Sequence, residues 1–134
     1  MRAVDANVVL RYVLDDLPEQ AARARRVIDA AEPVAVTGIA LAEVAWTLTG
    51  PRLRINRAAV AQVLLDLLGR ENIMAAGFDK GEAQQALQLC LPTAGGADLG
   101  DALITACANS AGIAEIYSFD QRFARAGLTP VLPD

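Results

Sequence analysis

Short apolar runs and longer helix-like segments alternate along almost the whole chain. Buried β-strands are expected over residues 2–6, 34–37, 73–76, 113–119 and 128–132. Apolar residues recur at helical spacing over about 7–14, 18–31, 38–50, 57–68, 79–91 and 98–109, and a short helical turn is expected over 121–126. Strands that alternate with helices favour a parallel sheet with right-handed crossovers. We therefore predict an α/β fold with a mostly parallel central sheet of four to five strands and helices on both faces.

Capping and turn residues support these boundaries. Pro18 suits the first turn of a helix, and Asn56 and Gly69 are suited to begin and end the helix between them. No repeat or linker interrupts the pattern, and 134 residues are enough for one ordinary core. We expect one domain over residues 1–134.

Four acidic residues lie within or beside strongly apolar stretches, where a charged side chain is least expected. They are Asp5, Glu43, Asp101 and Asp120. Basic neighbours are scarce, since Glu43 is the only charge between residues 34 and 51 and no Lys or Arg occurs between residues 81 and 121. A buried carboxylate needs a counter-charge. The chain has no histidine, so a hard cation such as Mg²⁺ or Mn²⁺, which prefers oxygen ligands, is the expected partner.

The predicted elements place these four acids near the same edge of the sheet. Asp5 and Asp120 each follow a strand, Asp101 lies in the first turn of its helix, and Glu43 lies about one turn into another. Ligands of α/β sheets gather beyond the carboxyl ends of the strands. We therefore expect the four acids to converge there.

Each acid also has a simpler interpretation. Asp5 and Asp120 are suitable helix caps, Asp98 and Asp101 suit an N-cap and the first helical turn, and Glu43 can face solvent. Neighbouring polar groups fit a supporting role. Asn7 and Ser118 would orient carboxylates by hydrogen bonds, as would Thr37 and Thr105.

Four segments, in order along the chain, resemble the motifs of PIN-domain nucleases. The opening Val4-Asp5-Ala6-Asn7 followed by Val8-Val9-Leu10 is similar to the family's D-x-N-apolar start, and Leu41-Ala42-Glu43-Val44-Ala45-Trp46 to its apolar helix with one glutamate. Asp98-Leu99-Gly100-Asp101-Ala102 resembles its D-x-x-D-A helix start, and Ser118-Phe119-Asp120-Gln121-Arg122-Phe123 its (T/S)-F-D-x-x-F turn. Together the segments span nearly the whole chain, at the compact length of VapC-like toxins.

The resemblance implies a metal-dependent endoribonuclease. The metal ligands of the family match Asp5, Glu43 and Asp101, with Asp120 beside a second ion or its water, whereas Asp98 matches a cap or a water-mediated contact. Membership of the VapC-like branch implies a toxin that cleaves structured RNA, forms a homodimer and is inhibited by a cognate antitoxin.

The charge balance neither requires nor excludes an RNA partner. The formal net charge is -4, from 12 basic and 16 acidic residues, but bound cations would offset the acids of the site. Almost every basic residue is arginine, the side chain best suited to phosphate. Candidate RNA contacts are Arg11, Arg52, Arg54 and Arg122, with Arg57 and Arg125 as further candidates, although any one of them can be an ordinary surface group.

The remaining features argue for a cytoplasmic protein without redox chemistry. The charged start Met1–Asp5 does not resemble a signal peptide, and no apolar run is long enough for a membrane span. Cys90 and Cys107 lack metal-binding spacing and are expected to be buried, and Trp46 is expected in the core or a subunit interface.

Two other functions remain open. One is a non-catalytic PIN-like scaffold that binds RNA or protein. The other is a Mg²⁺-dependent phosphatase or phosphoacceptor domain, which is disfavoured because residue 7 is Asn rather than Asp and Lys80, the only lysine, lies far from the motifs.

Overall fold

The computed structural model describes all 134 residues and contains five strands and seven helices in alternation. The strands are β1 (Arg2–Val4), β2 (Val34–Thr37), β3 (Ile73–Ala76), β4 (Glu115–Tyr117) and β5 (Thr129–Val131). The helices are α1 (Ala6–Leu14), α2 (Pro18–Ile28), α3 (Gly38–Thr49), α4 (Arg57–Leu68), α5 (Lys80–Gln88), α6 (Leu99–Ser110) and the 3₁₀ helix η1 (Gln121–Ala126). The predicted α/β class is confirmed.

Side-chain caps begin most of the helices where the sequence indicated. Asp5, Thr37, Asn56 and Asp98 each accept a hydrogen bond from a backbone N–H in the first turn of the helix that follows. Pro18 occupies the first position of α2, where its missing N–H has no cost. The helix starts therefore follow from local side-chain chemistry. The helix ends were predicted less well, since α2 and α5 end about three residues earlier than expected.

The strands are all parallel, but they form two sheets instead of one. The first has the order β1-β2-β3 and the second pairs β4 with β5. Parallel register places Val4 opposite Val36 in the first sheet and Ile116 opposite Pro130 in the second. The expected parallel pairing is confirmed, whereas the expected continuity of the sheet is not found because β4 does not reach β1.

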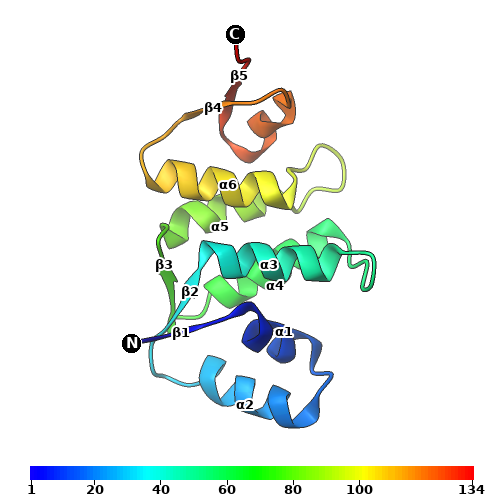
Figure 1. Cartoon of the computed structure of the whole chain (residues 1–134), viewed down its shortest axis with the longest axis vertical. Helices are drawn as coiled ribbons and strands as arrows, with labels where there is room; N and C mark the ends of the chain where they lie inside the picture. Colours follow the sequence, from blue (N-terminus) through cyan, green and yellow to red (C-terminus); the bar gives the residue numbers. More distant parts are fainter.

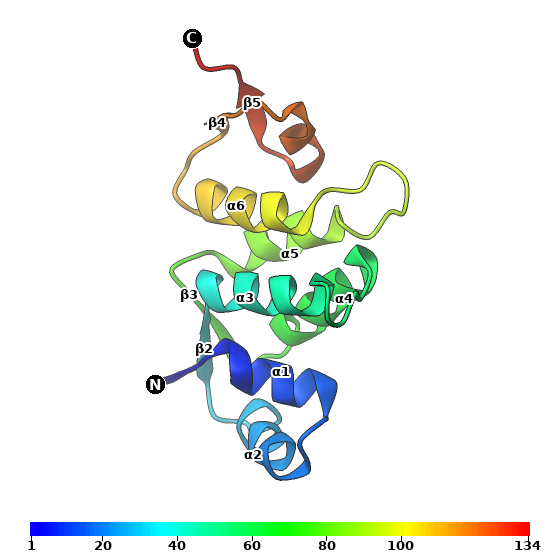
Figure 2. The same cartoon turned by 45° about the vertical axis from the view of Figure 1, so that its right-hand side comes forward.

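The elements are stacked along the long axis of an elongated molecule. Figures 1 and 2 show α1 and α2 towards one end, α3 to α6 in the middle, and β4, β5 and η1 at the other end. Helix α6 packs against α5 and α3, and η1 packs against α6. The two sheets are therefore separated by the central helices.

A single hydrophobic core links these layers. It joins 28 buried residues from Val4 to Ala126, with Val9 of α1, Val44 of α3 and Leu64 of α4 completely inaccessible to solvent. Burying each such side chain contributes about 1.5–3 kcal/mol relative to leaving it exposed. Most of this core comes from helices that pack against one another, since each strand is only three or four residues long.

Candidate active site

One pocket contains the first two predicted metal ligands. Asp5 follows β1 and caps α1, with its Oδ1 accepting a hydrogen bond from the N–H of Val8 at 3.0 Å. Glu43 projects from α3 into the same pocket, which Asn7 and Trp46 also line. Glu43 is exposed and makes no ion pair or hydrogen bond. Asp5 and Glu43 thus form a pair of carboxylates from two packed helices.

A second pocket contains the other two predicted ligands at the start of α6. Asp98, Asp101 and Asp120 line it together with Arg57 and Arg122. The Oδ1 of Asp98 accepts a hydrogen bond from the N–H of Asp101 at 3.0 Å, so Asp98 is the N-cap of α6 and Asp101 lies in its first turn. This pocket has no hydrophobic lining residue.

Asp101 and Asp120, which both line this second pocket, have pKa values shifted in opposite directions. Partial burial raises the pKa of Asp101 above its usual value, and the nearby charges of Asp98 and Asp120 raise it further. The guanidinium of Arg122 donates hydrogen bonds to both carboxylate oxygens of Asp120, each at 3.0 Å, and lowers the pKa of Asp120. Asp101 makes no ion pair, and the more distant charge of Arg122 offsets the rise in its pKa only in part.

The four predicted ligands do not converge in one chain. No group of three or more acidic or thiol side chains is close enough together to hold a metal ion. Asp5 and Glu43 line one pocket, while Asp101 and Asp120 line another. The prediction assumed that the carboxyl ends of β1 and β4 share one sheet edge, and this assumption is wrong here because these strands belong to separate sheets.

The expected burial of the acids was also wrong in part. Asp5 and Glu43 are exposed, and Asp101 and Asp120 are only partly buried. An apolar neighbourhood in sequence did not bury them. Asp5 and Asp120 are N-caps whose carboxylates bond to backbone N–H groups at the start of a helix, and Glu43 lies on an exposed face of α3. Asp120 also has the cation that the sequence did not suggest, in Arg122 two residues later.

The supporting polar residues act mainly on the backbone. The Ser118 hydroxyl accepts a hydrogen bond from the N–H of Asp120 at 2.9 Å and thus positions the main chain rather than the carboxylate. Thr37 caps α3 by accepting from the N–H of Ala40, and the buried Thr105 hydroxyl has no partner. Asn7 lies beside Asp5, where its side chain makes no hydrogen bond.

The candidate RNA-contacting arginines differ in their availability. Arg11 pairs with Asp16 at 3.4 Å, and the Nε of Arg54 donates to the carbonyl of Pro51 at 3.1 Å. Arg122 is paired with Asp120, whereas Arg52 is exposed and makes neither an ion pair nor a hydrogen bond. Arg52 is the one of these four whose guanidinium is uncommitted.

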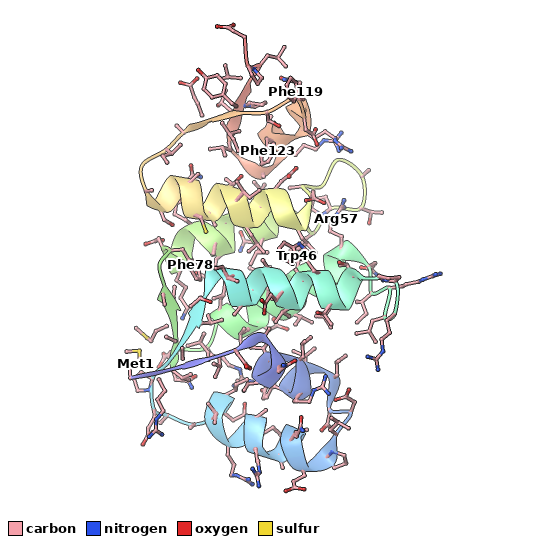
Figure 3. The ribbon with its side chains drawn as sticks, in the orientation of Figure 1. Met1, Trp46, Arg57, Phe78, Phe119 and Phe123 are labelled. Atoms are coloured by element: carbon pink, nitrogen blue, oxygen red, sulfur yellow. The ribbon has the colours of Figure 1, made fainter.

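Arg57 has a structural role that the sequence did not reveal. Its guanidinium reaches across to the loop before α6 and donates to the carbonyls of Cys90 at 3.0 Å, Thr93 at 3.3 Å and Gly96 at 3.5 Å, as well as to that of Pro92. Figure 3 shows Arg57 beside the start of α6. No acidic residue lies close to Arg57 in the sequence, so the sequence did not indicate a partner for its guanidinium.

Two further expectations were wrong in part. Trp46, on α3, is 66% exposed, which excludes a place in the core, whereas a place in a subunit interface stays a prediction. Cys90 is buried, as expected, and burial raises the pKa of its thiol to about 11, but Cys107 is exposed on α6. Helical periodicity alone did not predict that the face bearing Cys107 lacks a covering element.

Comparison with known protein families identifies the fold. The model of the PIN domain matches residues 2–128, nearly the entire chain, and the chain therefore belongs to the PIN domain family, whose fold is that of nucleases. No individual curated protein sequence matches it. None of its helices combines the length and the hydrophobicity required to cross a bilayer.

Proposed function

We propose that this PIN-domain protein is an endoribonuclease that uses Mg²⁺ or Mn²⁺ to hydrolyse phosphodiester bonds in structured RNA. The observation that carries the proposal is the match to the PIN domain over residues 2–128, together with acidic residues at all four motif positions. A nuclease without histidine has no imidazole base, which fits catalysis by carboxylates and a cation.

The ligand chemistry fits a hard divalent cation. Asp5, Glu43 and Asp101 would hold the principal ion through carboxylate oxygens, and Asp120 would contact a second ion or its water. Such ions, when bound, lower the pKa of water and neutralise phosphate oxygens. Glu43 and Asp101 form no ion pair in the chain, so both carboxylates are available for this role. Asp120 must first exchange its contact with Arg122.

Arginine side chains near the two pockets would bind the RNA backbone. Arg122 and Arg125 line the pocket of Asp101, and Arg11 lies beside Asp5 in an adjoining groove. Arg122 released from Asp120 would carry a free guanidinium at the position where a phosphate must approach. Exposed Arg52 and Arg54 would extend this contact.

The biological role follows from the resemblance to VapC-like toxins. We propose a cytoplasmic toxin that acts as a homodimer and is inhibited by a cognate antitoxin. The apolar side chains on the surface of α3 and α6, which include Ile39, Trp46 and Ile104, support the existence of a protein partner.

A non-catalytic scaffold is the second candidate function. Two observations favour it, namely the division of the four acids between two pockets and the bidentate contact between Arg122 and Asp120. Such a protein would bind RNA or protein without cleaving it and would show no specific affinity for Mn²⁺.

Metal binding and RNA cleavage distinguish these candidates. Calorimetric titration with Mn²⁺ should show binding that is lost in Asp5→Asn and Asp101→Asn, and cleavage of structured RNA should stop in both variants and on chelation. Asp66→Asn is the matched control, since Asp66 is an exposed carboxylate on α4 outside both pockets. Full chelator-sensitive cleavage by Asp5→Asn or Asp101→Asn would exclude the proposed mechanism, and metal-independent RNA binding without cleavage would favour the scaffold.

A further inference from the structure

A groove between α1 and α2 adjoins the pocket of Asp5 and Glu43. The two helices pack against each other at one end of the molecule (Figures 1 and 2). The groove, called the α1–α2 groove from here on, has a volume of about 320 Å³, which is within the range of sites for small ligands. Asp5 and Asn7 line both the groove and the pocket, so a ligand in the groove would lie directly beside the acids.

The lining of the α1–α2 groove combines apolar and polar side chains. Val8 and Arg11 of α1 are three residues apart and therefore share one face of their helix. The residues of α2 recur at helical spacing and form a stripe opposite them, namely Gln20, Arg23, Ala24 and Val27. The groove thus offers aliphatic surface, two cations and uncharged polar groups within one small space.

The two arginines of the groove have unused binding capacity. The Nε of Arg11 is buried without a hydrogen-bond partner, and the ion pair of Arg11 with Asp16 is long, at 3.4 Å. A buried donor without an acceptor has a cost in free energy that a bound anion would remove. Arg23 pairs only with Glu19, at 3.3 Å, and both side chains are highly exposed, so this pair contributes little. Both guanidinium groups are therefore available to a phosphate.

Two amide side chains of the groove are also free. Gln20 and Asn7 are exposed, and neither side chain makes a hydrogen bond within the chain. An amide presents donors and an acceptor side by side. This combination distinguishes one base edge from another, because each base has its own order of donors and acceptors.

The groove is a fixed feature of the packing between α1 and α2. Ala24 and Ile28 of α2 are buried in the contact. Near the turn that joins the helices, Arg25 donates to Asp15 at 2.8 Å, and at the other end of α2 the hydroxyl of Tyr12 donates to Asp29 at 2.7 Å. Substitution of the exposed residues Gln20 and Arg23 should therefore leave the shape of the groove unchanged.

We propose that the α1–α2 groove binds the nucleotide next to the cleaved phosphate, and that Gln20 determines which base is accepted there. The aliphatic side chains would contact the face of the base, the amide of Gln20 its edge, and Arg11 and Arg23 the adjoining phosphate. The inference rests on the proposed function, because an RNA held at Asp5 and Glu43 is what extends into the groove. An acidic peptide is the alternative occupant, since it would also bind two arginines, but it would not use the amide to discriminate among bases.

Base preference in RNA binding tests the role of Gln20 without cleavage. The whole chain in EDTA is mixed with a pool of hairpin RNAs that have a randomised loop, and the bound RNA is sequenced. The wild-type chain should prefer one base at one position, and Gln20→Glu, which replaces amide donors by an acceptor, should change that preference about tenfold. Gln85→Glu is the matched control, because Gln85 is an exposed glutamine on α5 that makes no hydrogen bond and lies outside the groove.

The salt dependence of binding tests the phosphate contact. Fluorescence anisotropy with one selected hairpin should show that Arg23→Gln raises the dissociation constant about tenfold at low salt. The slope of the logarithm of affinity against the logarithm of salt concentration should fall by about one, as expected for one lost phosphate contact. Arg26→Gln changes an exposed and unpaired arginine of α2 outside the groove and should leave both quantities unchanged. Circular dichroism checks that each variant is folded.

The outcomes separate the groove from the proposed function. An unchanged base preference in Gln20→Glu or an unchanged salt slope in Arg23→Gln would overturn the inference. Loss of affinity in Arg23→Gln without any base preference in the wild-type chain would also overturn it and would favour an acidic peptide. Cleavage in Mg²⁺ is measured separately, so a wild-type chain that binds RNA with base preference but never cleaves it would refute the nuclease and retain RNA binding in the groove. A chelator-sensitive nuclease whose cleavage sites are the same in Gln20→Glu would retain the proposed function and exclude Gln20 as its specificity residue.

Discussion

The contacts of Arg57 lead to a quantitative prediction about the segment that carries the second pocket. Substitution Arg57→Ala removes a guanidinium that holds the carbonyls of residues 90–96 just before the N-cap of α6. That segment precedes Asp98 and Asp101, and Arg57 itself lines their pocket. Loss of Arg57 should therefore weaken both the fold and the second pocket.

The size of the effect follows from which bonds water can replace. A hydrogen bond from a charged donor contributes about 1.5–3 kcal/mol. The bond to the Cys90 carbonyl, at 3.0 Å, is partly buried and counts fully, whereas the contact with Thr93 is exposed and that with Gly96 is long, at 3.5 Å. We expect Arg57→Ala to lower the free energy of unfolding by about 2–3 kcal/mol.

Urea denaturation monitored by circular dichroism measures this change, and the melting temperature should fall by roughly 6–10 °C. Arg57→Lys should have an intermediate effect, because an ammonium group lacks the planar fork that reaches several carbonyls. Arg52→Ala is the control, since Arg52 lies exposed in the connection between α3 and α4 and its side chain makes no hydrogen bond or ion pair. A loss below about 0.5 kcal/mol in Arg57→Ala would refute the anchoring role.

Three further measurements test other features of the structure. Thr105→Val should leave the free energy of unfolding unchanged or raise it by up to about 1 kcal/mol, because the buried hydroxyl has no partner; a marked loss in urea denaturation would reveal a missed bond. At pH 8 a thiol reagent should modify Cys107 rapidly and Cys90, whose pKa is raised to about 11, only after unfolding; a rapid phase that persists in Cys107→Ser would contradict this. An NMR titration should give Asp120 a pKa below its usual value, and Arg122→Gln should raise that pKa towards the ordinary range but not fully, because the N–H of residue 122 still donates to the carboxylate. The contribution of the Asp120–Arg122 pair to stability is therefore present above the ordinary pKa of Asp and is lost as the pH falls through the lowered value. An unaltered pKa in Arg122→Gln would exclude the ion pair as the cause.

Local features of the fold were predictable from the sequence because short-range chemistry determines them. The helix starts at Ala6, Arg57 and Leu99 follow from capping residues that bond within three positions along the chain. The parallel arrangement follows from the alternation of strands and helices. The acidic motif residues were recognisable for the same reason, since their spacing within each segment is local.

Properties that depend on contacts between distant segments were not predictable. The exposure of Cys107 and Trp46 depends on the absence of a covering element above α3 and α6. The partners of Arg57 lie more than 30 residues away in sequence, and no motif connects them. Asp120 lies near Arg122 in sequence, but their bidentate contact depends on the conformation of η1.

The sequence by itself determined the α/β class, the parallel strands, the helix caps and the membership of the PIN family. Only the tertiary structure decided that β4 pairs with β5 and not with β1, and thus that the four acids of one chain lie in two pockets. The physical reason is the range of the interactions. Caps and hydrophobic periodicity act over one helical turn, whereas the relative position of two strands more than 100 residues apart is set by the packing of η1 on α6 and of α6 on α3 and α5.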